Sequence, residues 1–210
     1  PGLPGDEVGQ GVASARDVNG DAVPDLIVGV MYSDAFGPNL RTIRLHSGAD
    51  GALLHELLGP QVPEGYWGEA VAGAGDLDGD GMGDVICGAP FGGGFVRAFS
   101  GATGGLLFEL IGGEYEGLGR SVCAAGDWDD DGHDDAAVGS GAGYVLIISG
   151  ATHEVLEQIV LAGITDALSQ GMGGAAMCAG GVDIDGDGQL DFAVGLPSSG
   201  TGKVVFVSGD

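Results

Sequence analysis

Apolar and polar residues follow one another along this chain in short runs, and the same order of runs occurs four times. The clearest runs are rich in β-branched and aromatic residues, as β-strands are, and each ends in Ser followed by Gly. These runs occupy residues 42–47, 95–100, 144–149 and 203–208. No segment carries a sustained helical period. The pattern therefore predicts an all-β fold that is built from an internal repeat.

Each repeat is predicted to contain four antiparallel strands. A strand of very small residues comes first, as at 71–75 and 122–126, and an acidic loop follows it. A more apolar strand and the Ser-Gly strand come next, and a fourth strand is predicted at 53–58, 106–111 and 155–160. The acidic loops recur roughly every 50–60 residues, a period that suits the four-stranded blade of a β-propeller.

One domain is expected over residues 1–210, with blades at approximately 6–60, 61–113, 114–163 and 164–210. The last blade lacks its fourth strand in this sequence, which leaves an unpaired strand edge. A homodimer that completes a larger ring would fill that gap and fits the two-fold symmetry common among homo-oligomers. The alternatives are a piece of a larger propeller and a compact four-bladed monomer.

Each acidic loop places oxygen-bearing side chains at positions 1, 3, 5 and 9, and the backbone carbonyl of position 7 offers one more oxygen. Carboxylates so close together repel one another unless a hard cation lies among them, and Ca²⁺ accepts several oxygen ligands at about 2.3–2.6 Å. The sequence therefore predicts up to four Ca²⁺ sites, one in each blade. The predicted ligands are Asp17, Asn19, Asp21, Val23 and Asp25; Asp76, Asp78, Asp80, Met82 and Asp84; Asp127, Asp129, Asp131, His133 and Asp135; and Asp183, Asp185, Asp187, Gln189 and Asp191.

Two other readings of these loops compete with that prediction. An EF-hand needs a bidentate Glu at position 12, but the residues there are Val28, Cys87, Val138 and Val194. The other reading is a set of polar Asp/Gly turns that hold no metal.

The loops also differ from one another. The first loop carries Asn19 at position 3 and Ala22 at position 6, where the other loops have Gly, so its site should be the weakest. The third loop contains two further acidic residues, Asp130 and Asp134, which are expected to be solvated.

The formal net charge of −25 is concentrated in the four loops, which hold more than half of the 31 acidic residues. With only six Lys and Arg residues, the chain is not expected to bind nucleic acid. No apolar run approaches the roughly 18–20 residues of a membrane span. No signal peptide is visible, and because the chain begins at Pro1 a leader would already have been removed.

Catalytic chemistry is not predicted. None of the four His residues lies in a recognisable nucleophile pattern, and the three Cys residues, which form no CxxC pair, are expected to be buried free thiols. Four aromatic residues admit two readings, packing between blades or stacking on a sugar or partner. They are Tyr66, Trp67, Tyr115 and Trp128.

The second repeat carries the clearest family motif. It reads Tyr66-Trp-Gly, then the small strand and the acidic loop from Asp76, and then Gly88-Ala-Pro90. These motifs resemble FG-GAP repeats, which form the blades of the integrin α-subunit propeller and occur in many bacterial secreted and surface proteins. The first half of the motif is altered, to Trp67-Gly68 here and to Leu118-Gly119 and Met172-Gly173 in later repeats. The resemblance covers nearly the whole chain.

The resemblance implies a radial array of four-stranded antiparallel blades, with calcium in the loop between the first two strands of each blade. Propellers of this family usually have seven blades, whereas this chain supplies about four. The implied function is a calcium-binding, non-catalytic scaffold for extracellular protein–protein or adhesive contacts, in a secreted or cell-surface protein. The alternative is a carbohydrate-binding propeller or an accessory domain of a larger secreted enzyme. The protein or glycan ligand remains unknown from the sequence.

Overall fold

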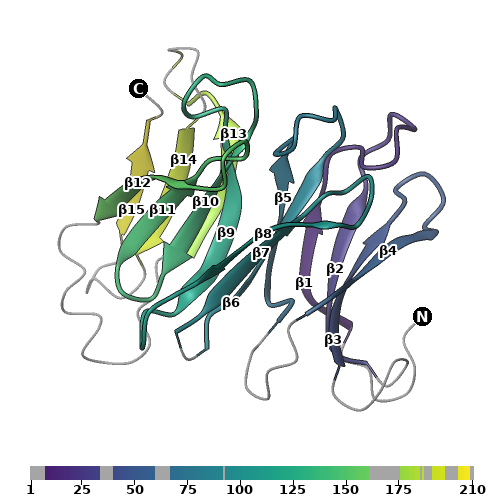
Figure 1. The fold of residues 1–210 in the computed structure, drawn as a ribbon, viewed down its shortest axis with the longest axis horizontal. Helices are drawn as coiled ribbons and strands as arrows, with labels where there is room; N and C mark the ends of the chain where they lie inside the picture. Colours follow the sequence, from purple (N-terminus) through teal and green to yellow (C-terminus); the bar gives the residue numbers. More distant parts are fainter. Residues whose placement is uncertain are drawn as a thin grey trace.

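The computed structural model describes residues 8–33, 40–59, 67–91, 93–160, 176–184, 186, 191–196 and 203–208. The described residues form fifteen β-strands and no helix, in four antiparallel sheets that follow one another along the chain (Figure 1). The predicted all-β propeller of four-stranded antiparallel blades is therefore confirmed. Within the described part of the chain, no helix could cross a membrane.

The first three sheets have four strands each, in the order in which they occur in the sequence. The first contains β1 (Val8–Ser14), β2 (Leu26–Ser33), β3 (Leu40–His46) and β4 (Leu53–Leu58). The second contains β5 (Ala70–Gly75), β6 (Asp84–Ala89), β7 (Phe95–Phe99) and β8 (Leu106–Ile111). The third contains β9 (Leu118–Gly126), β10 (Asp135–Ser140), β11 (Tyr144–Ile148) and β12 (Val155–Val160).

The described part of the fourth sheet contains β13 (Ala176–Val182), β14 (Asp191–Leu196) and β15 (Lys203–Val207). Its strands thus match the first three strands of the other blades. The blade boundaries expected from the sequence stay a prediction, since several of them fall outside the described residues. One predicted strand was too short at its start, because β9 already begins at Leu118 and includes the Leu-Gly pair that was expected to precede the strand.

Three apolar clusters fill the spaces between successive sheets. Ile43, Leu45 and Val85 belong to the cluster between the first two sheets, and all three side chains are fully buried. The next cluster, around Ile86 and Ile148, joins the second sheet to the third. The last cluster, which includes Phe192, joins the third to the fourth. Because the strands are buried on both faces there, the core lies between blades rather than within any one of them.

Pairs of glycines bring the second strand of one blade close to the start of the first strand of the next blade. A Cβ on Gly29 would lie 2.0 Å from the carbonyl oxygen of Gly68, and one on Gly88 would lie 2.0 Å from that of Gly119. Gly68 and Gly119 have φ values of +89° and +80°, which residues that carry a side chain rarely adopt. In both pairs, a Gly of the second strand therefore contacts the Gly that follows the aromatic or apolar residue, Trp67 or Leu118, at the start of the next repeat.

This contact predicts the effect of adding one methyl group at Gly88. Gly88→Ala should lower the free energy of unfolding by about 1–3 kcal/mol, because backbone atoms of two blades would have to separate. Thermal unfolding would show the loss as roughly 2–4 °C in Tm for each kcal/mol. Gly105→Ala is the matched control, since its added Cβ would meet only a side-chain atom, at 3.1 Å. Equal Tm values for the two variants would contradict this account of blade packing.

Candidate metal centre

The acidic loops connect the first and second strands of each blade, so all four leave their sheets at the same end of the strands (Figure 1). The first three loops are described completely. In the fourth, Asp183, Ile184, Gly186 and Asp191 are described, whereas the predicted ligands Asp185, Asp187 and Gln189 lie outside the described residues.

Position 1 organises each loop through backbone hydrogen bonds. In the second loop, the N–H groups of Asp80 and Gly81 donate to the two carboxylate oxygens of Asp76, at 3.0 and 2.9 Å. Asp127 accepts the same two bonds in the third loop, and Asp17 accepts four in the first. The loop therefore curls around the first carboxylate.

Position 5 fixes the backbone of position 7 in the same manner. The N–H of Met82 donates to Asp80 at 2.8 Å, and the N–H of His133 donates to Asp131 at 2.9 Å. Val23 makes the equivalent bond to Asp21 at 2.8 Å. Because its N–H is held in this way, position 7 has a defined backbone orientation in all three loops. Its carbonyl oxygen stays a predicted ligand.

Position 9 anchors each of the first three loops to the turn that follows the third strand, which the sequence did not reveal. The side chain of Asp84 is fully buried, and its Oδ2 accepts a hydrogen bond from the N–H of Leu77 at 2.7 Å. Its Oδ1 accepts one from the N–H of Gly101, the glycine that follows the Ser-Gly strand, at 3.0 Å. The same pair of bonds joins Asp25 to Val18 and Gly48, and Asp135 to Trp128 and Gly150.

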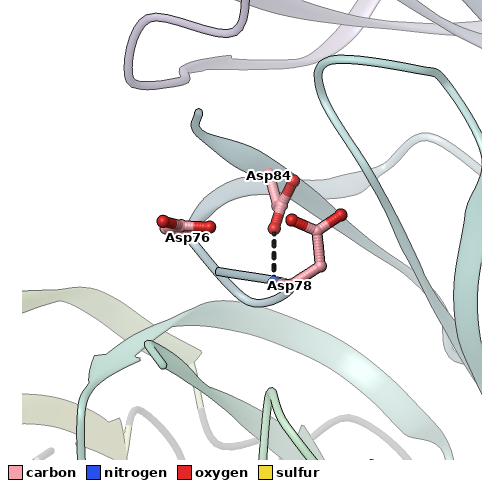
Figure 2. Close-up of side chains that lie close together, drawn as sticks. All are labelled: Asp76, Asp78 and Asp84. Atoms are coloured by element: carbon pink, nitrogen blue, oxygen red, sulfur yellow. Dashed lines mark hydrogen bonds between the residues drawn. The ribbon is translucent and has the colours of Figure 1, made fainter. Parts of the chain in front are cut away.

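Three carboxylates converge in each of two loops. One oxygen from each of Asp76, Asp78 and Asp84 lies within 4.8 Å of the others, and Figure 2 shows these side chains around the curl of the loop. Asp127, Asp129 and Asp135 form the same arrangement in the third loop. The structure thus brings together positions 1, 3 and 9 of the second and third loops.

The donor set of these two clusters fits a divalent cation. Burial, together with the nearby charge of Asp78, raises the pKa of Asp84 to about 6 in spite of the backbone hydrogen bonds that lower it. Burial likewise raises the pKa of Asp135 to about 6, with Asp129 and Asp131 as the neighbouring charges. A cation among these oxygens would offset both the cost of burial and the repulsion. Oxygen-only ligands are those that Ca²⁺ prefers.

The first loop differs from the second and third as the sequence predicted. Position 3 is Asn19, and no group of three acidic side chains meets among residues 17–25. The N–H of Asp21 donates to the Asn19 side chain at 3.0 Å, so the loop keeps its shape with one charge fewer. The expectation that the first site is the weakest stays a prediction that this geometry supports.

The aromatic residues divide between the two readings that the sequence left open. Trp67 is 1% exposed and belongs to the apolar cluster between the first two sheets, where it stacks on Phe95 with 5.4 Å between the ring centroids. Trp128 is partly buried against Phe192. Tyr115, by contrast, is 84% exposed. Tyr66 lies outside the described residues.

One expectation about the third loop was wrong. Asp130 is exposed, as predicted, but the side chain of Asp134 is only 14% exposed and forms an ion pair with Arg16, with 2.8 Å between Nη1 and Oδ2. Its position in the sequence gave no sign of this, because Arg16 lies two blades earlier in the chain.

Four-stranded antiparallel sheets packed face to face, with acidic loops at one end, define a β-propeller with candidate metal sites in its hairpin loops. Residues 67–105 match the FG-GAP repeat family. The chain is 34% identical over 156 residues to integrin alpha-4 of Xenopus laevis, an alignment that covers 62% of this chain and 14% of that protein. It is 30% identical over 199 residues to human integrin alpha-7, covering 89% of this chain and 16% of that protein.

A third relative, integrin alpha pat-2 of Caenorhabditis briggsae, is 30% identical over 231 residues and covers 93% of this chain and 18% of that protein. The chain therefore carries FG-GAP repeats in an integrin-like propeller. It spans less than a fifth of the length of each of these relatives.

The carboxylates of positions 9 and 3 should contribute differently to stability when one oxygen is replaced by an amide NH₂ group. Asp84→Asn should lower the free energy of unfolding in EGTA by about 1–3 kcal/mol, because its amide group would face a backbone N–H that also donates. Asp78→Asn should leave stability in EGTA nearly unchanged, since its one loop hydrogen bond needs a single oxygen. Chemical denaturation of both variants in EGTA checks this; equal stabilities would show that Asp84 has no structural role.

Proposed function

We propose that this chain is a calcium-stabilised, non-catalytic propeller that presents a surface for protein–protein contacts outside the cell. The observation that carries the proposal is the convergence of three carboxylates in each of two equivalent loops. The integrin-like repeat supports the extracellular setting and the protein partner, in line with what the resemblance implies.

The residues at positions 1, 3, 5 and 9 of each loop, with the carbonyl of position 7, would hold the ion. Bound Ca²⁺ would supply the positive charge that these carboxylates otherwise lack. Backbone N–H groups already orient the carboxylates of positions 1, 5 and 9, so little rearrangement would be needed on binding. A site that is ordered in advance loses less conformational entropy when the ion binds.

The histidines support the absence of catalysis, because each has a local structural contact. A ring nitrogen of His46 lies 3.1 Å from the carbonyl oxygen of Gly51, and one of His55 lies 3.2 Å from that of Ala102. His153 packs on the ring of Phe108. Buried thiols such as Cys87, whose pKa burial raises, are poor nucleophiles.

The surface that we assign to a partner is the end of the blades opposite to the acidic loops. Antiparallel pairing places the β6–β7 and β8–β9 connections there, and they carry the exposed aromatic residues Phe91 and Tyr115. Hydrogen bonds from Gly141 and Ala142 to the carbonyls of Gly117 and Glu116 hold the Tyr115 loop against the next blade. A carbohydrate ligand is the alternative that the 84% exposed Tyr115 also favours.

An assay of glycan binding distinguishes a protein ligand from a carbohydrate ligand. A glycan array probed with and without Ca²⁺ should give no specific signal if the partner is a protein. A signal that Tyr115→Ser abolishes, at unchanged Tm, would instead establish the carbohydrate-binding alternative.

Calcium dependence is the direct test of the proposal. EGTA should lower Tm, and millimolar Ca²⁺ should restore it better than Mg²⁺, whose rigid octahedral geometry suits these loops poorly. A ligand present at 100 times its Kd stabilises the folded state by about 2.7 kcal/mol at each site. The variant Asp78→Ala should lose part of the calcium-dependent gain. Melting curves that do not change on chelation would reject calcium binding.

The homodimer expected from the sequence stays a prediction. Light scattering at low micromolar concentration checks it, since a single species near the chain mass of 20.6 kDa would reject a dimer.

A further inference from the structure

Residues His133 and Asp134 of the third acidic loop contact the second loop directly. The N–H of Asp134 donates to the carbonyl oxygen of Asp76 at 2.9 Å, and the N–H of Asp76 donates to Oδ2 of Asp134 at 2.8 Å. Nδ1 of His133 lies 3.0 Å from the carbonyl oxygen of Leu77. Both backbone polar groups of Asp76, the first predicted ligand of the second loop, are thus bound by the third loop.

Asp134 is held in this position from two sides. Oδ2 also accepts the bond from Arg16, which lies next to the first acidic loop. Gly75 makes room for the carboxylate, because a Cβ there would lie 2.3 Å from Oδ2. A single carboxylate therefore touches residues of all three described loops or their immediate neighbours.

The equivalent contact between the second and first loops is weaker. There the N–H of Gly83 donates to the carbonyl oxygen of Asp17 at 2.8 Å, which reproduces the backbone bond of Asp134 to Asp76. Gly83 has no side chain to bind the N–H of Asp17. The first three loops, which are described completely, thus show two versions of one loop-to-loop contact, and of these two the one between the second and third loops includes a carboxylate.

We propose that Asp134 is a positioning residue that makes Ca²⁺ binding in the second and third loops mutually dependent. An ion held by Asp127, Asp129 and Asp135 would fix the backbone around Asp134, and Asp134 would in turn fix the backbone of Asp76. The second ion then meets a first ligand that is already ordered, so less entropy is lost on its binding. By linkage the effect is reciprocal. The inference rests on the proposed calcium binding.

Calcium titration followed by residue-resolved ¹H–¹⁵N NMR tests the coupling in the whole chain. The amide of Gly81, bonded to Asp76, reports on the second loop, and the amide of Gly132, bonded to Asp127, reports on the third. The midpoint is the Ca²⁺ concentration at which an amide signal has undergone half of its change. Disabling the third site with Asp129→Ala should raise the midpoint of the Gly81 signal by about 5-fold or more, the lower range of measured couplings. In an Asp134→Ala background, Asp129→Ala should change that midpoint less than 2-fold.

Asp130→Asn is the matched control, because it removes the same charge from the same loop at an exposed residue with a φ of +57° that Asn tolerates. In that background the 5-fold effect should persist. Asp134→Gly is the second variant if Asp134→Ala does not fold, since it recreates the residue found at Gly83. It should also abolish the coupling.

Two failures are distinguishable. If neither amide responds to Ca²⁺, the proposed function itself is wrong. If both respond but Asp129→Ala leaves the midpoint at Gly81 unchanged, or if the coupling survives in the Asp134 variants, the sites are independent and this inference is overturned.

Discussion

The buried carboxylate at position 9 of each acidic loop is the interaction on which the rest of the blade depends. Asp84 receives hydrogen bonds from the start of its own loop and from Gly101, beyond the third strand. It therefore joins the loop to the turn between the third and fourth strands of the same sheet, in a place from which solvent is excluded. An unpaired donor there would cost about 1–3 kcal/mol. An amide in its place would offer one accepting oxygen instead of two, and a nearby cation would offset the cost of burying the ionised carboxylate.

The acidic loop is also part of the contact between blades. Val18 and Leu77, at position 2 of their loops, are buried at 1% and 0% exposure. Added Cβ atoms on Gly101 and Gly150, in the turns of the following blades, would lie 2.8 Å from Cβ of Val18 and 3.0 Å from Cα of Leu77. The first and second loops thus pack against a turn of the next blade. An ion that rigidifies one loop would consequently stabilise the packing of two blades.

Sequence reasoning succeeded where the information is periodic. Four repeats of one strand order, each with Asp at positions 1 and 9, were enough to predict the sheets and their pairing. Of the four carboxylates predicted to bind one ion in the second loop, Asp76, Asp78 and Asp84 lie together, and the ligand set itself stays a prediction. The sequence did not predict the hydrogen bonds between an acidic loop and a turn elsewhere in the fold, because these depend on how the strands are arranged in space. The partner of Asp84 beyond its loop is a backbone N–H 17 residues away, and any residue but proline at that place has one. Only the recurrence of Ser-Gly after each third strand could have suggested it.

The contacts of Asp134 likewise could not be predicted from the repeat. Oxygen-bearing side chains recur at positions 1, 3, 5 and 9 of the loops. Asp134 is at position 8, so its side chain was expected to face solvent. The side chain instead lies over Gly75, where the absence of a Cβ leaves space, and meets Arg16 from the first blade. A residue such as Asp134, which departs from the repeat, therefore indicates a property of this particular chain that the repeated residues do not. The repeated positions determine how each loop is built, whereas the unrepeated carboxylate of Asp134 would determine how one loop responds to the state of its neighbour.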